Sequence, residues 1–281
     1  MGISHPVART AFYCCAIRAD DAAAAGPVCG DTLAARFLDE QTRRELQPVV
    51  RLPAPAASNV ARHRLIDDLL RRTLLDDPAR RIIVLGAGFD TRPFRLTGGR
   101  WYEIDDPPLL AFKEERLPAA SAPNPLTRIP VDFQTERLAG RLAPLAGDDA
   151  AVIVLEGVTM YLDDDRLAAL AATLLDALPQ ATLICDLMSP TFARTFGRGI
   201  RAELGRLGAS FGTQRGHPRE HFERAGYRVR ERHSIALRAH QAGTMPVPGL
   251  LITLLPLLRN GYAVWVLEPR GPSAGARSRS H

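Results

Sequence analysis

The fold is decided by Arg81-Ile82-Ile83-Val84-Leu85-Gly86-Ala87-Gly88-Phe89-Asp90-Thr91-Arg92, which Trp101-Tyr102-Glu103-Ile104-Asp105 follows shortly. The first run is short, apolar and rich in β-branched residues, which is typical of a buried parallel strand. The turn Gly86-Ala87-Gly88 lets the backbone bend tightly and approach a ligand closely. Asp105, at the end of the next predicted strand, can accept hydrogen bonds from the hydroxyls of a ribose. The stretch therefore predicts a nucleoside pocket at the carboxyl end of a doubly wound sheet.

The residues after the glycine turn indicate which nucleoside is bound. A dinucleotide fingerprint has three glycines, and here Thr91 stands where the third would be. Asp90 comes just before it, and a carboxylate at this helix start would repel a pyrophosphate. The pattern favours S-adenosylmethionine, which has no phosphate, over NAD. A glycine turn without any ligand stays open as the structural alternative.

Length and composition predict one elaborated α/β domain. A chain of 281 residues can bury a substantial single core. Its most apolar stretch, residues 249–258, is shorter than the ~20 apolar residues of a membrane span and contains Pro256. The start of the chain lacks the apolar segment of a secretory signal. We therefore expect no membrane partner and a cytoplasmic location.

The charge of the chain is weak evidence for nucleic-acid binding. The net charge is +5, but Lys113 is the only lysine, and the arginines are dispersed. Such an arginine-rich, lysine-poor chain suggests GC-rich coding rather than a basic binding face, so a nucleic-acid partner is not expected.

Cysteine and histidine spacing argues against a metal site. The four cysteines form no C-x-x-C pair, and we expect free thiols in a reducing cytosol: Cys14, Cys15, Cys29 and Cys185. His217 and His221 have i,i+4 spacing, but no third ligand lies near them in the sequence. The sequence therefore predicts no metal.

The pattern along the chain divides it into three parts. Residues 1–75 form a predicted helical cap with helices over 10–25, 32–46 and 59–75, and the proline-rich residues 52–55 separate the last two. Residues 76–270 form the predicted Rossmann-like core, with a substrate lid near 240–260. Residues 271–281 are rich in glycine, serine and arginine and are expected to be disordered.

Strands and helices alternate in the predicted core, which indicates a parallel sheet with right-handed crossovers. We expect strands near residues 81–85, 100–104, 127–131, 151–155, 181–186, 228–236 and 263–267, with a helix over 164–178 among the connections.

Two further predicted strands end in acidic residues. Glu156 follows the apolar run 152–155 and is placed to meet a cationic amino or sulfonium group, with Tyr161 lining the pocket. A capping glutamate with a core tyrosine is the alternative. Asp132 ends another strand beside Phe133, an arrangement that suits an adenine amine and ring.

The chain resembles the leucine carboxyl methyltransferase family, in its branch of polyketide and small-molecule carboxyl O-methyltransferases. The resemblance covers roughly residues 7–190 and is carried by four blocks: Arg9-Thr10-Ala11 with Arg18-Ala19; Ala61-Arg62 with Ile66-Asp67; residues 85–92 with 102–107; and Glu156-Gly157 with Tyr161-Leu162. It implies a class I S-adenosylmethionine-dependent methyltransferase fold with an N-terminal helical cap.

The resemblance also implies roles for the pocket residues. Arg9 and Arg62 would meet the methionine carboxylate, although lysine is expected at position 9 in the eukaryotic enzymes. Gly86, with its neighbours Ala87 and Gly88, would line the methionine and ribose. The remaining expected contacts are Asp105 with the ribose, Asp132 and Phe133 with adenine, and Glu156 with the amine. Asp67 and Arg92 look structural.

These observations predict methyl transfer to a small molecule, most simply to a carboxylate oxygen. A carboxylate is ionised at neutral pH and needs no general base, so catalysis would rest on alignment. Catalytic residues stay unassigned, with Tyr161 and Glu156 as pocket candidates. Three alternatives remain: another acceptor atom of a metabolite or of tRNA, a non-catalytic nucleoside-binding protein, and an NAD oxidoreductase. The acceptor and the oligomeric state are not readable from the sequence.

Cofactor titration separates these classes. We expect S-adenosylhomocysteine and S-adenosylmethionine to bind and NAD not to bind, because Asp90 and Thr91 suit a cofactor without phosphate. Isothermal calorimetry with each compound measures this. Binding of NAD without any response to S-adenosylhomocysteine would contradict the assignment.

Overall fold

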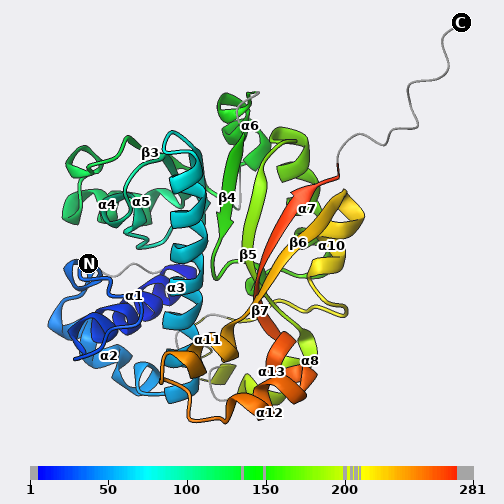
Figure 1. The fold of residues 1–281 in the computed structure, drawn as a ribbon. Coiled ribbons are helices and arrows are strands. Elements are labelled where there is room, and N and C mark those ends of the chain that lie inside the picture. Colours follow the sequence, from blue (N-terminus) through cyan, green and yellow to red (C-terminus); the bar gives the residue numbers. More distant parts are fainter. Residues whose placement is uncertain are drawn as a thin grey trace, which may run out of the picture.

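The computed structural model describes residues 6–133, 136–147, 150–198, 201–202, 205, 208 and 210–270. They form a seven-stranded sheet with the order β3-β2-β1-β4-β5-β7-β6, shown in Figure 1. The first five strands pair in parallel, and β7 runs antiparallel to both β5 and β6. The strand bounds are Arg81–Leu85 (β1), Arg100–Asp105 (β2), Leu126–Pro130 (β3), Ala151–Leu155 (β4), Thr182–Met188 (β5), Tyr227–Ser234 (β6) and Tyr262–Pro269 (β7).

The sheet confirms the predicted fold class. The strand order reverses between β1 and β4, because β2 lies on one side of β1 and β4 on the other. Ligands of open α/β sheets bind in the crevice that opens at the carboxyl ends of strands at such a reversal. The glycine turn after β1 and Glu156 after β4 therefore lie on the two sides of this crevice.

Helices cover both faces of the sheet, as the alternation of side chains along each strand requires. Ile83 and Leu85 face a core that contains α7 (Asp164–Ala177), α10 (Arg219–Ala225) and α6 (Leu138–Leu142). Ile82 and Val84 face the opposite core, which contains α3 (Pro53–Asp76) and α11 (Ile235–Gln241). Shorter helices follow β1 and β2, namely α4 (Arg92–Arg95) and α5 (Pro107–Arg116).

The N-terminal helices differ in detail from the predicted ones. The first is α1 (Pro6–Ala23), and a 3₁₀ turn η1 (Ala34–Phe37) precedes α2 (Glu40–Val50). The second helix begins later than expected because the Asp39 side chain accepts a hydrogen bond from the Thr42 amide and caps it. Residues 52–55 are not a separate joint, since Pro53 starts α3, where a missing amide hydrogen has no cost.

The C-terminal part contains one wrong strand boundary. The expected strand over 228–236 ends at Ser234, whose side chain accepts a hydrogen bond from the Leu237 amide and starts α11. Figure 1 shows α8 (Pro190–Phe196), α11, α12 (Gly249–Leu254) and α13 (Pro256–Asn260) gathered at the same end of the sheet as α1 and α2. The predicted tail, residues 271–281, lies outside the described residues.

All four cysteines are free thiols, as predicted. Within the described part of the chain, no helix combines the length and apolarity that a membrane crossing requires.

A buried arginine joins α3 to the loops after β1 and β4. Arg92 is fully buried and donates to Asp67 over 2.6 Å, to Asp90 over 2.5 Å and to Glu156 over 2.8 Å. Burial alone would raise the pKa of Asp67, but Arg92, His63 and Arg95 together outweigh this effect and hold that pKa below its usual range. The structural role expected for Arg92 and Asp67 agrees with this geometry.

Replacing Arg92 should destabilise the fold. Arg92→Met would leave three carboxylates short of a buried partner, so we expect the free energy of unfolding to fall by about 3–5 kcal/mol. Urea unfolding measures it, with Arg44→Met on the exposed surface of α2 as the control. A loss at position 92 no larger than that of the control would contradict this role.

Candidate functional site

One large cavity opens at the carboxyl ends of the parallel strands. Its volume is about 1340 Å³, and it is enclosed by α1, α3, the turns after β1, β2 and β4, α8 and the 240–260 segment. Pockets for one small molecule typically enclose about 300–1,000 Å³. The cavity therefore has room for a nucleoside cofactor together with a second ligand.

The glycine turn forms the floor of this cavity. Gly86 has a φ of 71° and Gly88 a φ of 47°, both in the left-handed region that favours glycine. A Cβ added at Gly86 would lie 2.5 Å from Val158 Cγ2, so the turn also lets the loop after β4 pack closely. Gly86, Ala87 and Gly88 all line the cavity, as the sequence predicted.

Asp105 lies at the end of β2 and lines the cavity beside this turn. Its carboxylate accepts hydrogen bonds from the backbone amides of Gly88, over 2.6 Å, and Asp106, over 2.7 Å. Burial disfavours the charged form and raises its pKa to about 6. The amides fix the carboxyl group at the edge of the glycine turn, where ribose hydroxyls would meet it.

Glu156 is the meeting point of the cap and the sheet. It accepts hydrogen bonds from Arg62 Nε over 3.0 Å and from Arg92 Nη2 over 2.8 Å, and His63 Nδ1 lies 3.1 Å from Oε2. Burial opposes its ionisation, but Arg92, His63 and Arg62 outweigh it, so the pKa of Glu156 is well below its usual range. Glu156 is therefore an ionised carboxylate on the cavity wall, as expected for a residue that meets an amine.

Arg62 is held by a carboxylate and a phenol that the sequence did not single out. Its Nη1 donates to Asp186 over 3.2 Å and to the Tyr262 hydroxyl over 2.6 Å, and Tyr262 donates to Asp186 over 2.7 Å. Asp186 also accepts from the Gly157 amide. The signal for Asp186 was present, because it is a lone carboxylate in an apolar strand.

The ion pairs around the cavity form one connected network with an excess of negative charge. Its members are four arginines and five carboxylates: Arg18, Arg62, Arg92 and Arg95 with Asp31, Asp67, Asp90, Glu156 and Asp186. Burial, reinforced by Arg92, lowers the pKa of His63, which stays uncharged. The half-exposed Arg71 touches the edge of the network but pairs more closely with Asp68. Counted without Arg71, these five carboxylates and four arginines carry one net negative charge, which suits a cationic sulfonium or ammonium group.

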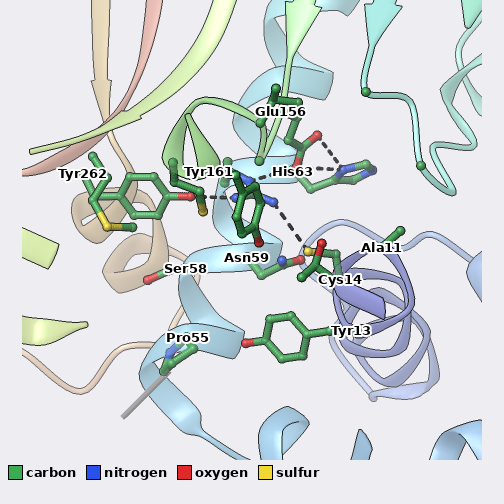
Figure 2. A pocket seen from close by; sticks show the side chains of 18 of the residues that line it. Ala11, Tyr13, Cys14, Pro55, Ser58, Asn59, His63, Glu156, Tyr161 and Tyr262 are labelled. Carbon is green, nitrogen blue, oxygen red and sulfur yellow. Dashed lines mark hydrogen bonds and ion pairs between the residues drawn. The ribbon is translucent and has the colours of Figure 1, made fainter. Parts of the chain in front are cut away.

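Figure 2 shows the part of the cavity where Glu156 and Tyr161 lie beside His63 of α3 and residues of α1. Tyr161 lines the cavity as predicted, and burial raises its pKa. Tyr13 on α1 and Asn59 on α3 also line it, and the motifs of the sequence contain neither of them.

The remaining predicted contacts are less closely associated with the cavity. Phe133 is half-exposed and lines the cavity. Its sequence neighbour Asp132 is not among the residues that line the cavity. Arg9 is exposed and does not line the cavity, whereas the next residues on α1, Thr10 and Ala11, do. Within the described residues, no cluster of three or more His, Cys, Asp or Glu side chains could hold a metal ion.

Comparison with known proteins assigns the family. The model described as leucine carboxyl methyltransferase matches residues 11–175. The chain belongs to the leucine carboxyl methyltransferase family. A relative from Frankia alni, named "putative S-adenosyl-L-methionine-dependent methyltransferase", is 36% identical over 146 residues, 50% of this chain and 48% of its own length. A Streptomyces coelicolor relative of the same name is 34% identical over 140 residues, 48% of this chain and 47% of its own length.

The chain thus spans about half the length of the curated relatives it matches. Their names and the family match confirm, at the level of the family, the predicted dependence on S-adenosylmethionine. The match also confirms the family resemblance that the sequence predicted.

Solved structures support the same fold at low sequence identity. A DUF574-family protein from Streptomyces avermitilis has a TM-score of 0.56 and 14% identity, over 82% of this chain and 91% of its own. The magnesium protoporphyrin IX methyltransferase of Synechocystis PCC 6803, solved with bound S-adenosylhomocysteine, has a TM-score of 0.50 and 13% identity, over 85% and 99%.

Asp105 should make cofactor binding depend on pH. With a pKa of about 6, its carboxyl is mostly ionised at neutral pH and able to accept from both ribose hydroxyls. At about pH 5 only roughly one carboxyl in eleven would be ionised, so S-adenosylhomocysteine affinity should fall about tenfold. Calorimetry across this range measures the effect. Asp105→Asn should bind weakly with no such slope; a retained slope would assign the titration elsewhere.

Arg62 should not tolerate lysine. A lysine keeps the charge but offers one compact ammonium in place of the planar fork whose Nε and Nη1 reach Glu156 and Asp186, so we expect S-adenosylhomocysteine affinity to fall about tenfold or more. Arg62→Ala should bind still more weakly and should also lower stability, because two buried carboxylates lose a partner. Affinity and urea unfolding are measured side by side. Wild-type affinity of the lysine variant would refute a forked guanidinium contact.

Proposed function

We propose that the protein transfers the methyl group of S-adenosylmethionine to a carboxylate oxygen of a small molecule. The observation that carries the proposal is that one large cavity has both a charged part and an apolar part in its wall. Asp105, the glycine turn and the net-negative network suit the ribose and the cationic amino-acid part of the cofactor. The apolar part adds volume beyond one ligand and suits an acceptor.

The cofactor, when bound, supplies an electrophilic methyl group on a sulfonium. In this arrangement Asp105 would hold the ribose, Arg62 the methionine carboxylate and Glu156 the amine, while Phe133 would cover the adenine. Arg9 stays the least supported of the predicted contacts, since its side chain is exposed. The chain's contribution is to orient the two ligands and to exclude water between them.

The state of the side chains favours an acceptor that needs no deprotonation. His63 is engaged by Arg92 and Arg95, and burial lowers its pKa. Glu156 accepts from two arginines, and burial raises the pKa of both Tyr13 and Tyr161. Among the described lining residues these groups are poor bases. An ionised carboxylate reacts with a methyl sulfonium without losing a proton, so its methylation does not depend on any of these groups as a base.

The context of the reaction is also part of the proposal. The small-molecule branch of the family and the apolar acceptor end suggest specialised metabolism. The four free thiols suit a reducing cytosol. Methylation of a hydroxyl, nitrogen or sulfur, or of tRNA, and a non-catalytic nucleoside-binding role are the alternatives that the test must separate.

Methyl transfer from labelled cofactor tests the proposal. Purified protein is incubated with methyl-labelled S-adenosylmethionine and a panel of carboxylic acids, with the matching alcohols, amines and thiols in parallel. We expect label only in the acid arms, and we expect alkali to release it as volatile methanol, because esters hydrolyse and ethers do not. Asp105→Ala is the matched negative control. Alkali-stable label from the alcohols or amines would refute carboxylate methylation, and binding of S-adenosylhomocysteine without transfer in any arm would favour the non-catalytic alternative.

A further inference from the structure

Two buried polar groups on the cavity wall have no hydrogen-bond partner among the described residues. They are the Tyr13 hydroxyl and Asn59 Oδ1. The two residues are only 5% and 6% exposed, and both line the cavity. Buried polar groups are nearly always paired, and an unpaired one on a residue of a pocket wall can take its partner from a ligand.

The positions of these groups are set by packing rather than by polar contacts. Tyr13 belongs to an apolar cluster with Ile17 and Val60, and Tyr161 packs against the same cluster. Figure 2 shows Tyr13 coming from α1 and Asn59 from α3. Asn59 lies three residues before Arg62 and therefore on the same face of α3. The pair thus adjoins the network proposed to hold the methionine part of the cofactor.

The wall beyond this pair is mainly apolar. It is formed by α8, α11 and the 240–260 segment, with Met188, Phe192, Phe196, Ile235, Met245 and Val247 among its residues. A ligand in this region would bury an apolar body and could satisfy only a few polar groups. Among the described lining residues, Tyr13 and Asn59 are the ones with a buried side-chain atom that has no partner.

We propose that Tyr13 and Asn59 form a hydrogen-bonding subsite for a hydroxyl or amide group of an acceptor whose remaining body is apolar. A phenol donates or accepts, and a carboxamide offers one oxygen acceptor and two donor hydrogens. This pair therefore fits a neutral group that both donates and accepts better than an ionised one. The inference rests on the proposed function in that the second ligand is the methyl acceptor, and it narrows that acceptor to apolar acids with a hydroxyl or amide.

The experiment measures probe binding to wild-type protein saturated with S-adenosylhomocysteine. The probes are decanoic acid, decanoic acids with one hydroxyl at successive chain positions, and the corresponding diols. We expect at least one hydroxy acid to bind about tenfold more tightly than decanoic acid, because a buried polar pair discriminates against a ligand that leaves it unsatisfied. Calorimetry gives each affinity.

Three variants locate the effect. Tyr13→Phe and Asn59→Leu should remove most of the advantage of the hydroxy acid and leave S-adenosylhomocysteine affinity within about twofold of wild type. Tyr227→Phe is the matched control, because its hydroxyl is also buried and unpartnered but lies in the sheet core and does not line the cavity. The melting temperatures of Tyr13→Phe and Tyr227→Phe should not fall, since each change removes an unsatisfied group.

The outcomes separate the subsite from the proposed reaction. If no probe gains affinity from a hydroxyl, or if the variants at 13 and 59 weaken S-adenosylhomocysteine binding like changes to the cofactor site, the subsite is refuted. If the diols bind through Tyr13 but no acid is methylated, the carboxylate assignment fails and the subsite stands. If acids are methylated and the hydroxyl makes no difference, the reaction stands and the subsite fails.

Discussion

The structure depends on one buried interaction, the pairing of the Glu156 carboxylate with Arg62 and Arg92. Glu156 directly follows β4, Arg92 starts the helix after the glycine turn, and Arg62 comes from the cap helix α3. Burying these charges is tolerable only because each has partners in the low-dielectric interior. The pairing therefore fixes the cap against the sheet at the reversal point of the strand order. Residues 1–75 are for this reason part of the site and of the apolar core, since α3 packs directly on β1.

The same constraint divides the cavity into two chemically different ends. Counted without Arg71, the network carries one net negative charge beside the glycine turn. This charge would stabilise a bound sulfonium, which brings no counter-ion of its own. Part of the wall, on α8, α11 and the 240–260 segment, is mainly apolar, and Tyr13 and Asn59 line the same cavity with unpaired groups. A site of this kind can hold a cationic donor and an apolar acceptor together, and alignment of the two can then supply much of the catalysis.

Much of the cofactor end could be predicted because its signals are local in the sequence. Gly86, Asp105 and Glu156 each follow a short apolar strand, and the parallel topology brings strand ends together. Other features depend on long-range contacts that no local pattern contains. Arg62 meets Tyr262 across 200 residues of sequence. The wrong boundaries at α2, α3 and β6 arise from single capping or N1 residues, which compete with the periodicity of the neighbouring segment.

A crystal structure of the S-adenosylhomocysteine complex tests the central claim most directly. We expect the ribose hydroxyls on the Asp105 carboxylate and the amino-acid end between Arg62 and Glu156, with the pairing of Glu156 and Arg92 intact. The region beside Tyr13 and Asn59 should stay free of the cofactor. A ligand whose amino-acid end lies away from Arg62 and Glu156, or a complex in which the Glu156–Arg92 pair is broken, would contradict it.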